Sequence, residues 1–352
     1  MSYKTRFILA LLAVTPTYLF ADTLIFALDI IRHGDRTPII ELPNADYHWA
    51  QGLGQLTAEG MEQEYKLGIE FRKLYVDQTH LLPENYQAGT MYVRSTDYDR
   101  TLMSAQSLLM GLYPPGTGPR TSENATPALP HAIQPIPIYT ASAKDDDVIN
   151  TDISAQEKEK LLQDYVYSTA QWQQKDNAIK DKYPLWSQLF GVPITNLMSM
   201  LLLGDAVFIH QIHKAPLPSG LSQQDADTIV ETGRWVFAAQ LRPTPIAKAY
   251  SSKLMVNIAN YLNTGSKQKS TLKYVLLSAH DSTIFGALSF LQAPLDSPPP
   301  YASNLKFALY ETIDKNYVVK ITLNGKPVVV PACGGSNCDL KQFRNYVESN
   351  VK

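Results

Sequence analysis

Residues 24–38 read LIFALDIIRHGDRTP and join an apolar run to a charged loop. Leu24 to Ile31 is apolar except for Asp29, which is typical of a strand buried on both faces of a sheet. The loop Arg32-His33-Gly34-Asp35-Arg36-Thr37-Pro38 follows the C-terminal end of that strand. Because ligands of open α/β sheets bind where strands end, this stretch predicts an α/β fold with a site at residues 32–38.

His33 lies between two arginines of this loop, Arg32 and Arg36. Both guanidinium groups stay charged, so they should lower the pKa of His33 and keep its imidazole neutral. Arginine is also a forked donor suited to phosphate oxygens. A neutral imidazole beside such donors has the properties that nucleophilic attack on phosphorus requires. Gly34 is expected to permit a tight turn in the loop.

The rest of the chain divides by its periodicity into two kinds of segment. Residues 22–118 and 241–352 predict an α/β domain, with a mainly parallel central sheet and helices on both faces. Residues 119–240 begin with proline-rich turns and then predict helices, so we expect a smaller, mostly helical domain inserted there. The expected helices are 57–76, 98–112, about 155–180, 196–213, 222–240 and 246–262, with others starting at Ser282 and near Asp339; the expected strands after residue 38 are 91–94, 274–278, 306–312 and 317–323.

Two further segments should lie beside the loop at 32–38, because each follows a predicted strand: Val93-Arg94-Ser95-Thr96 and Ala279-His280-Asp281-Ser282. Arg94 would add a donor, His280 another hydrogen bond, and Asp281 a proton for a leaving oxygen. A nearby phosphate dianion would raise the pKa of Asp281, which predicts an acid pH optimum. The alternatives are an Arg94 ion pair with Asp97 or Asp99 and a structural His-Asp turn.

Composition excludes several classes of protein. The chain has 352 residues, is 45% hydrophobic and carries a formal net charge of −2, which is typical of a globular protein and not of a nucleic-acid or membrane-surface binder. No segment after the N-terminus is apolar enough to predict stable membrane insertion. His210 and His213 share a predicted helix; no third metal ligand is evident, so surface or interface histidines are favoured.

The N-terminus and the cysteines both bear on location. Residues 1–21 predict an export signal, with Lys4 and Arg6 before an apolar run that is too short to span a bilayer. A buried first strand or an uncleaved anchor is the alternative. In an exported protein, Cys333 and Cys338 would form a disulfide, whereas free thiols are expected otherwise. Two thiolates alone do not complete a zinc site.

Several motifs in this order resemble those of the histidine acid phosphatases, most closely the prostatic and lysosomal type. The resemblance covers nearly the whole mature chain. It rests on RHGDRTP at 32–38, GQLT at 54–57, GMEQ at 60–63, YVRSTD and DRTLMSA within 92–105, PP at 114–115, HDST at 280–283 and PPYAS at 299–303.

The resemblance implies roles for the candidate residues. His33 would be the nucleophile that becomes phosphohistidine, and Asp281 would protonate the leaving alcohol and then help to activate water. Arg32, Arg36, Arg94 and His280 would bind the phosphoryl group. No metal or other cofactor is expected, the substrates would be phosphate monoesters, and a homodimer is favoured.

The chain departs from the animal members in its cysteines, because Asn304 stands where they have a cysteine and only Cys333 and Cys338 remain. This favours a simpler exported form, bacterial and either periplasmic or secreted. The functional alternatives are phytase-like or mutase phosphoryl transfer on the same fold, and a catalytically silent phosphate-binding or surface protein.

Overall fold

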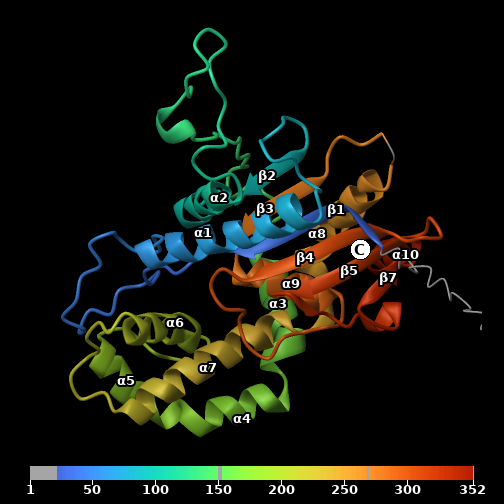
Figure 1. Cartoon of the computed structure of the whole chain (residues 1–352). Coiled ribbons are helices and arrows are strands. Elements are labelled where there is room, and N and C mark those ends of the chain that lie inside the picture. The colour runs from blue at the N-terminus through green and yellow to red at the C-terminus, as the bar shows by residue number, and fades with distance from the viewer. Residues whose placement is uncertain (1–21, 150–152, 268, 352) are drawn as a thin grey trace, which may run out of the picture.

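The computed structural model describes residues 22–149, 153–267 and 269–351, so the expected export signal lies outside the described residues. A central sheet contains the strands in the order β2-β3-β1-β4-β5-β6, and β7 pairs with β5 (Figure 1). The strands are β1 (Thr23–Arg32), β2 (Met91–Ser95), β3 (Tyr274–Ala279), β4 (Asn304–Glu311), β5 (Tyr317–Leu323), β6 (Lys326–Pro327) and β7 (Asn337–Asp339).

The sheet is mixed, with a parallel half and an antiparallel half. β1 and β2 each pair with β3 in parallel, so the C-terminal ends of these three strands share one edge. β4 runs antiparallel to β1, and β5 runs antiparallel to β4. Residues 312–316 join β4 to β5, and so short a connection permits only an antiparallel pair. The expected mainly parallel character is therefore corrected: it holds only for the half that carries the three candidate loops.

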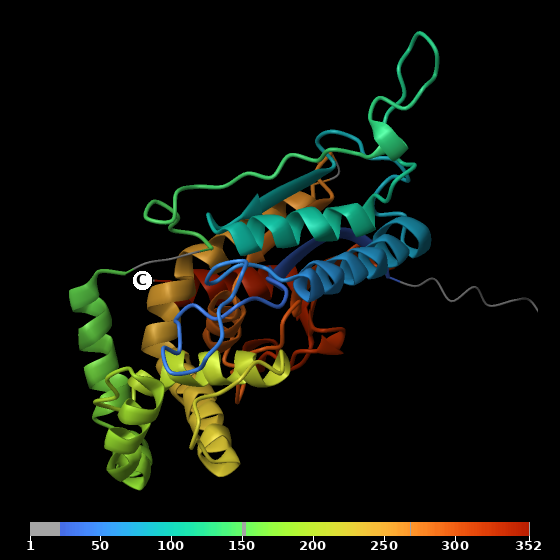
Figure 2. The same ribbon diagram turned by 90° about the vertical axis from the view of Figure 1, so that its left-hand side faces the viewer.

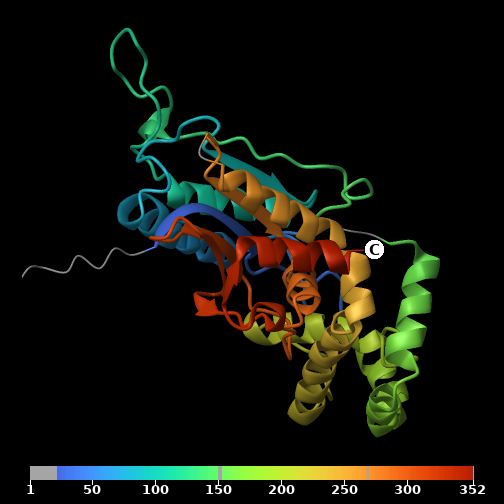
Figure 3. The same ribbon diagram turned by 90° about the vertical axis from the view of Figure 1, so that its right-hand side faces the viewer.

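Helices cover both faces of the sheet, as expected. α1 (Ala58–Arg72), which continues into a π-helical turn at Lys73–Gln78, and α2 (Asp99–Leu112) cover one face; α8 (Thr244–Gly265), α9 (Asp281–Phe290) and α10 (Leu340–Asn350) cover the other (Figures 1 and 3). Alternate residues of β1 serve the two cores. Ala27 and Ile31 pack with the α1–α2 side, and Leu28 and Ile30 with the α8–α10 side.

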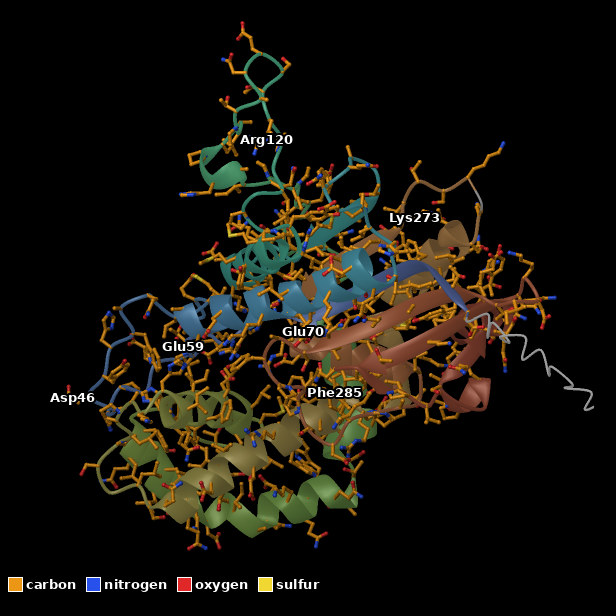
Figure 4. The ribbon with its side chains drawn as sticks, in the orientation of Figure 1. Asp46, Glu59, Glu70, Arg120, Lys273 and Phe285 are labelled. Atoms are coloured by element: carbon orange, nitrogen blue, oxygen red, sulfur yellow. A yellow bond between two sulfur atoms is a disulfide. The ribbon has the colours of Figure 1, made fainter. Side chains whose placement is uncertain are left out.

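The helical lobe consists of α3 (Ala155–Leu162), α4 (Ala170–Ile179), α5 (Tyr183–Phe190), α6 (Ser199–Ile212) and α7 (Gln223–Leu241) (Figures 1 and 2). It has its own apolar core, in which Trp186 and Phe190 are fully buried. Phe237 of α7 meets Phe285 of α9 edge to face, with ring centroids 5.5 Å apart, so the lobe packs directly against the α/β part. Figure 4 shows Phe285 between the sheet and the helical lobe.

The residues just before the lobe do not belong to it. Residues 119–140 contain only the 3-10 turn Pro130–Ala132, and Tyr139 pairs with β2, its N–H donating to the carbonyl of Val93 at 3.0 Å. Arg120 marks this excursion in Figure 4, on the side of the sheet away from the lobe. The prolines of this segment remove helix donors, so the helices of the expected insert begin only at Ala155. No helix within the described ranges is long and apolar enough to cross a bilayer.

Candidate active site

The three candidate loops meet at the edge formed by the C-terminal ends of β1, β2 and β3. The N–H of His33 donates to the carbonyl of Ala279 at 3.1 Å, and the N–H of Thr96 donates to that of Ser278 at 3.1 Å. The strand ladders thus continue beyond the strand ends and fix the loops relative to one another. His33 and His280 lie edge to face with ring centroids 5.6 Å apart, although the two residues come from distant parts of the sequence.

The hydrogen bond of His33 fixes its tautomer. Nδ1 lies 2.8 Å from the carbonyl oxygen of Gly34. A carbonyl only accepts, so Nδ1 carries the proton and Nε2 keeps a free lone pair. Burial lowers the pKa of His33 well below its usual value, and electrostatic interactions with Arg32, His280, Arg36 and Arg100 lower it further. The imidazole is therefore neutral, as the sequence predicts, but burial contributes more than the arginines.

Gly34 is required by close packing and not by a turn with positive φ. A Cβ atom at Gly34 would lie 2.3 Å from the carbonyl oxygen of Gly60, and one at Gly60 would lie 2.2 Å from the carbonyl oxygen of Asp35. The two glycines let the loop lie directly against the first turn of α1. Thr57 caps that turn by accepting from the N–H of Gly60, so the start of α1 and the loop form one rigid unit.

Arg32 and Arg36 are each held by a carboxylate from another segment. Nη2 of Arg32 lies 2.8 Å from Oδ2 of Asp281, and Arg36 makes a bidentate pair with Asp205 of α6 at 2.9 and 3.0 Å. Burial raises the pKa of Asp281, but Arg32 and Arg36 outweigh burial and hold the pKa below its usual value. The ion pair with Arg32 therefore keeps Asp281 ionised.

Arg94 does not join the cluster, which corrects its predicted place. Its guanidinium pairs instead with the buried carboxylate of Asp146 at 2.9 Å, and not with Asp97 or Asp99. Val93 and Ser95, its neighbours on β2, are buried while Arg94 is only partly buried, so the side chains alternate between the two faces of the strand. Arg94 therefore serves a structural ion pair.

Arg100, which the sequence interpretation missed, takes the position that Arg94 was expected to fill. It is the second residue of α2, and its charge lowers the pKa of both His33 and His280. Its guanidinium lies 4.6 Å from the ring centroid of Tyr98. The available signal was its place in the first helical turn after β2, where a side chain can reach the edge of the sheet.

His280 is buried and neutral beside His33. Its Nε2 lies 3.0 Å from the hydroxyl oxygen of Thr96, which in turn lies 2.9 Å from that of Thr101. Burial and the charge of Arg100 lower the pKa of His280 to about 3. The ring is therefore oriented by hydroxyl groups of the loop that follows β2.

Three buried donors in this cluster have no acceptor within the part of the chain that the structure describes. They are the Nε–H groups of Arg32, Arg36 and Arg100. Buried donors are nearly always hydrogen-bonded, and an unpaired one is costly. Three such groups on three charged side chains fit an anion with several acceptor oxygens, which is what a phosphoryl group offers.

One group of described side chains has the spacing of metal ligands: Asp35, Glu59 and His213, with ligand atoms within 4.8 Å of one another. We assign it as a contact between lobes, because Oδ2 of Asp35 already bonds Thr57 at 2.6 Å and Nε2 of His213 at 2.8 Å. Glu59 is exposed near the start of α1 (Figure 4). His210 does not join this group, since its Nδ1 lies 2.7 Å from the carbonyl oxygen of Pro216.

A bare imidazole nitrogen among buried arginines is an arrangement suited to phosphoryl transfer through histidine. The chain belongs to the histidine phosphatase superfamily (branch 2), whose family model matches residues 23–324. It is 32% identical to the lysosomal acid phosphatase of Xenopus laevis over 346 residues, which cover 92% of this chain and 76% of that one. It is 28% identical to the human prostatic acid phosphatase over 340 residues, covering 93% and 85%.

Solved structures show the same fold. The phytase of Citrobacter braakii matches with a TM-score of 0.68 at 16% identity, covering 94% of this chain and 98% of that one. The phytase of Klebsiella sp ASR1 matches with a TM-score of 0.67 at 17% identity, covering 94% and 97%. At these identities the likeness concerns the fold alone. The chain has the expected disulfide between Cys333 and Cys338.

Proposed function

We propose that this chain is an acid phosphatase that hydrolyses phosphate monoesters through a phosphohistidine on His33. The observation that carries the proposal is the bond between Nδ1 of His33 and the carbonyl of Gly34, because it leaves Nε2 as the nucleophilic atom. The family match and the acid phosphatase relatives support the same activity.

In the first half of the reaction, Nε2 of His33 attacks phosphorus while the bond from phosphorus to the leaving oxygen breaks. The unpaired Nε–H groups of Arg32, Arg36 and Arg100 would bind the equatorial oxygens. These donors are already in place, so little reorganisation is needed as charge develops. Arg100 replaces Arg94 in this role.

Asp281 would supply the proton that the leaving oxygen needs. Its ion pair with Arg32 keeps it ionised, but a phosphoryl group bound at the Nε–H of Arg32 would compete for the same positive charge and add a negative neighbour. Both changes raise the pKa of Asp281 and favour its protonated form. The same negative charge would raise the pKa of His280, so that its second nitrogen can donate to the phosphoryl group.

In the second half of the reaction, water attacks phosphorus and Asp281 accepts its proton. The bond between phosphorus and Nε2 breaks, which releases phosphate and returns neutral His33. Asp281 thus serves first as acid and then as base.

The decisive experiment is rapid mixing with a ³²P-labelled monoester, followed by an alkaline quench. We expect label on the protein that is stable to base and lost in acid, and no label on His33→Ala. Free phosphate should be the product. A rearranged ester without free phosphate would identify a mutase, and an unlabelled protein with no turnover of an aryl phosphate in mild acid would identify a silent binding protein.

We further propose that the protein is exported, to a periplasm or to the outside of the cell, and that it forms a homodimer. The disulfide between Cys333 and Cys338 supports an oxidising location. The lysosomal and prostatic names of its relatives are consistent with export.

A further inference from the structure

A cleft of about 590 Å³ opens between the sheet edge and the helical lobe. It lies beside the proposed phosphoryl-binding cluster of Arg32, Arg36 and Arg100. Arg32, Arg36 and Asp281 line it, so a leaving group attached to the phosphoryl group would extend into it. The walls that the lobe supplies are mainly apolar: Leu201, Leu202, Phe208 and Phe237. Apolar walls with few charged groups are typical of sites for small organic ligands.

Arg234 of α7 also lines this cleft, and it differs from the other arginines there. Arg32 and Arg36 are each paired with a carboxylate, at 2.8 Å for Asp281 and 2.9 Å for Asp205. Among the described residues, the contact of Arg234 is with an aromatic face: its guanidinium lies 4.6 Å from the ring centroid of Phe208. Its charge is therefore oriented by stacking but not neutralised by an acid.

We propose that Arg234 and Phe208 form a leaving-group subsite that selects aryl phosphate monoesters carrying one further anionic substituent, such as a carboxylate. The aromatic body of the leaving group would pack among Leu201, Phe208 and Phe237. Its anionic arm would pair with the forked donors of Arg234. This inference rests on the proposed function, since it names the class of ester that the same site hydrolyses.

The charges of the cleft argue against a polyanionic leaving group. Beyond the phosphoryl cluster, Arg234 is the cation that lines the described part of the cleft, and Asp205 adds a carboxylate. Several further phosphates would face apolar walls or Asp205, and burying an unpaired charge is costly. One anionic group, at the position of Arg234, is what the cleft can neutralise.

The test compares two esters of equal size, 3-(4-phosphonooxyphenyl)propanoate and its propanamide, so that the variable is the charge of the arm. Wild type should prefer the acid in kcat/KM. Arg234→Gln should lower kcat/KM for the acid about tenfold and for the amide less than twofold, while Arg234→Lys should restore part of the loss. Inositol hexakisphosphate should be a poorer substrate than the acid.

Lys158→Gln is the matched control, since Lys158 is an exposed cation of the same lobe that lines a different cavity. It should leave the acid-to-amide ratio unchanged. The subsite is refuted if Arg234→Gln affects both esters equally, if Lys158→Gln has the same effect, or if inositol hexakisphosphate is the best substrate. A wild-type protein that hydrolyses none of the esters would instead overturn the proposed function, and the subsite with it.

Discussion

Glu64 should make this protein more stable in mild acid than at neutral pH. It lies in the middle of α1, is fully buried, and neither of its carboxyl oxygens has a hydrogen-bond partner within the described residues. Burial raises the pKa of Glu64 well above its usual value, and no charge on a described residue opposes this effect. The folded protein therefore keeps this carboxyl group protonated at pH values where the unfolded chain ionises it.

The sign follows from proton linkage. Above pH 4.5, the ordinary pKa of this group, the unfolded chain has lost the proton that the folded protein retains. The folded state then binds more protons, so the free energy of unfolding falls as pH rises, until pH reaches the folded pKa. One pH unit corresponds to about 1.36 kcal/mol, so the loss between pH 4.5 and pH 7 is at most about 3.4 kcal/mol.

Glu64→Gln tests this reasoning, because the amide has the same shape but does not ionise. We expect urea unfolding to give similar stabilities for wild type and variant near pH 4.5. The variant should gain on wild type as pH rises, with a slope of up to about 1.4 kcal/mol per pH unit. Glu62→Gln is the control, since that exposed residue of the same helix pairs with Lys66.

Parallel stability profiles for wild type and Glu64→Gln between pH 4.5 and pH 7.5 would refute the assignment. They would mean that the carboxyl group ionises in the folded protein with a partner that lowers its pKa. A slope of the opposite sign would also refute it, because a carboxyl group with a lowered pKa stabilises the fold above its unfolded pKa.

Two further predictions concern the catalytic cluster. Arg100→Gln should lower kcat/KM for an aryl phosphate about 10- to 100-fold, because one charged hydrogen bond to the phosphoryl group is lost. Arg94→Gln should change kcat/KM much less and should instead lower the melting temperature. Steady-state kinetics and thermal unfolding of both variants test this prediction, and equal losses of kcat/KM would contradict the assignment of Arg100. Asp281→Asn should slow alkyl phosphates much more than p-nitrophenyl phosphate, whose leaving group needs no proton, and equal losses on both esters would contradict the role of Asp281 as acid.

The sequence predicted the structure best where a short local pattern determines the position of a strand or loop. Residues 26–31 alternate between two cores, which is why an apolar run predicted a central strand. The rule that ligands bind at strand ends then located His33 and His280. Arg94 shows where this reasoning was incomplete. Arg94 lies within β2, where successive side chains point to opposite faces of the sheet. The face on which Arg94 lies brings its side chain to Asp146.

Other features depend on contacts that no local pattern encodes. Asp205 reaches Arg36, and His213 reaches Asp35, only because α6 packs over the loop at residues 32–38. The first helix of the insert begins at Ala155, as the sequence predicts, but residues 119–140 have little periodicity and take their course from pairing with β2. The two contacts of α6 are tertiary contacts between residues 169 and 178 positions apart.

The carboxylate partners of the arginines explain how substrate binding and acid catalysis are linked. Arg36 uses both terminal nitrogens for Asp205 but keeps its Nε–H unpaired, so it can bind a phosphoryl oxygen without releasing Asp205. Arg32 likewise keeps its Nε–H unpaired among the described residues, but the carboxylate at its Nη2 is that of Asp281, the proposed proton donor. A phosphoryl group bound at the Nε–H of Arg32 therefore shares this guanidinium with Asp281 and weakens the attraction that keeps Asp281 ionised. In the proposed mechanism, binding of the substrate thus creates the proton donor that its leaving group requires, and mild acid supplies the proton.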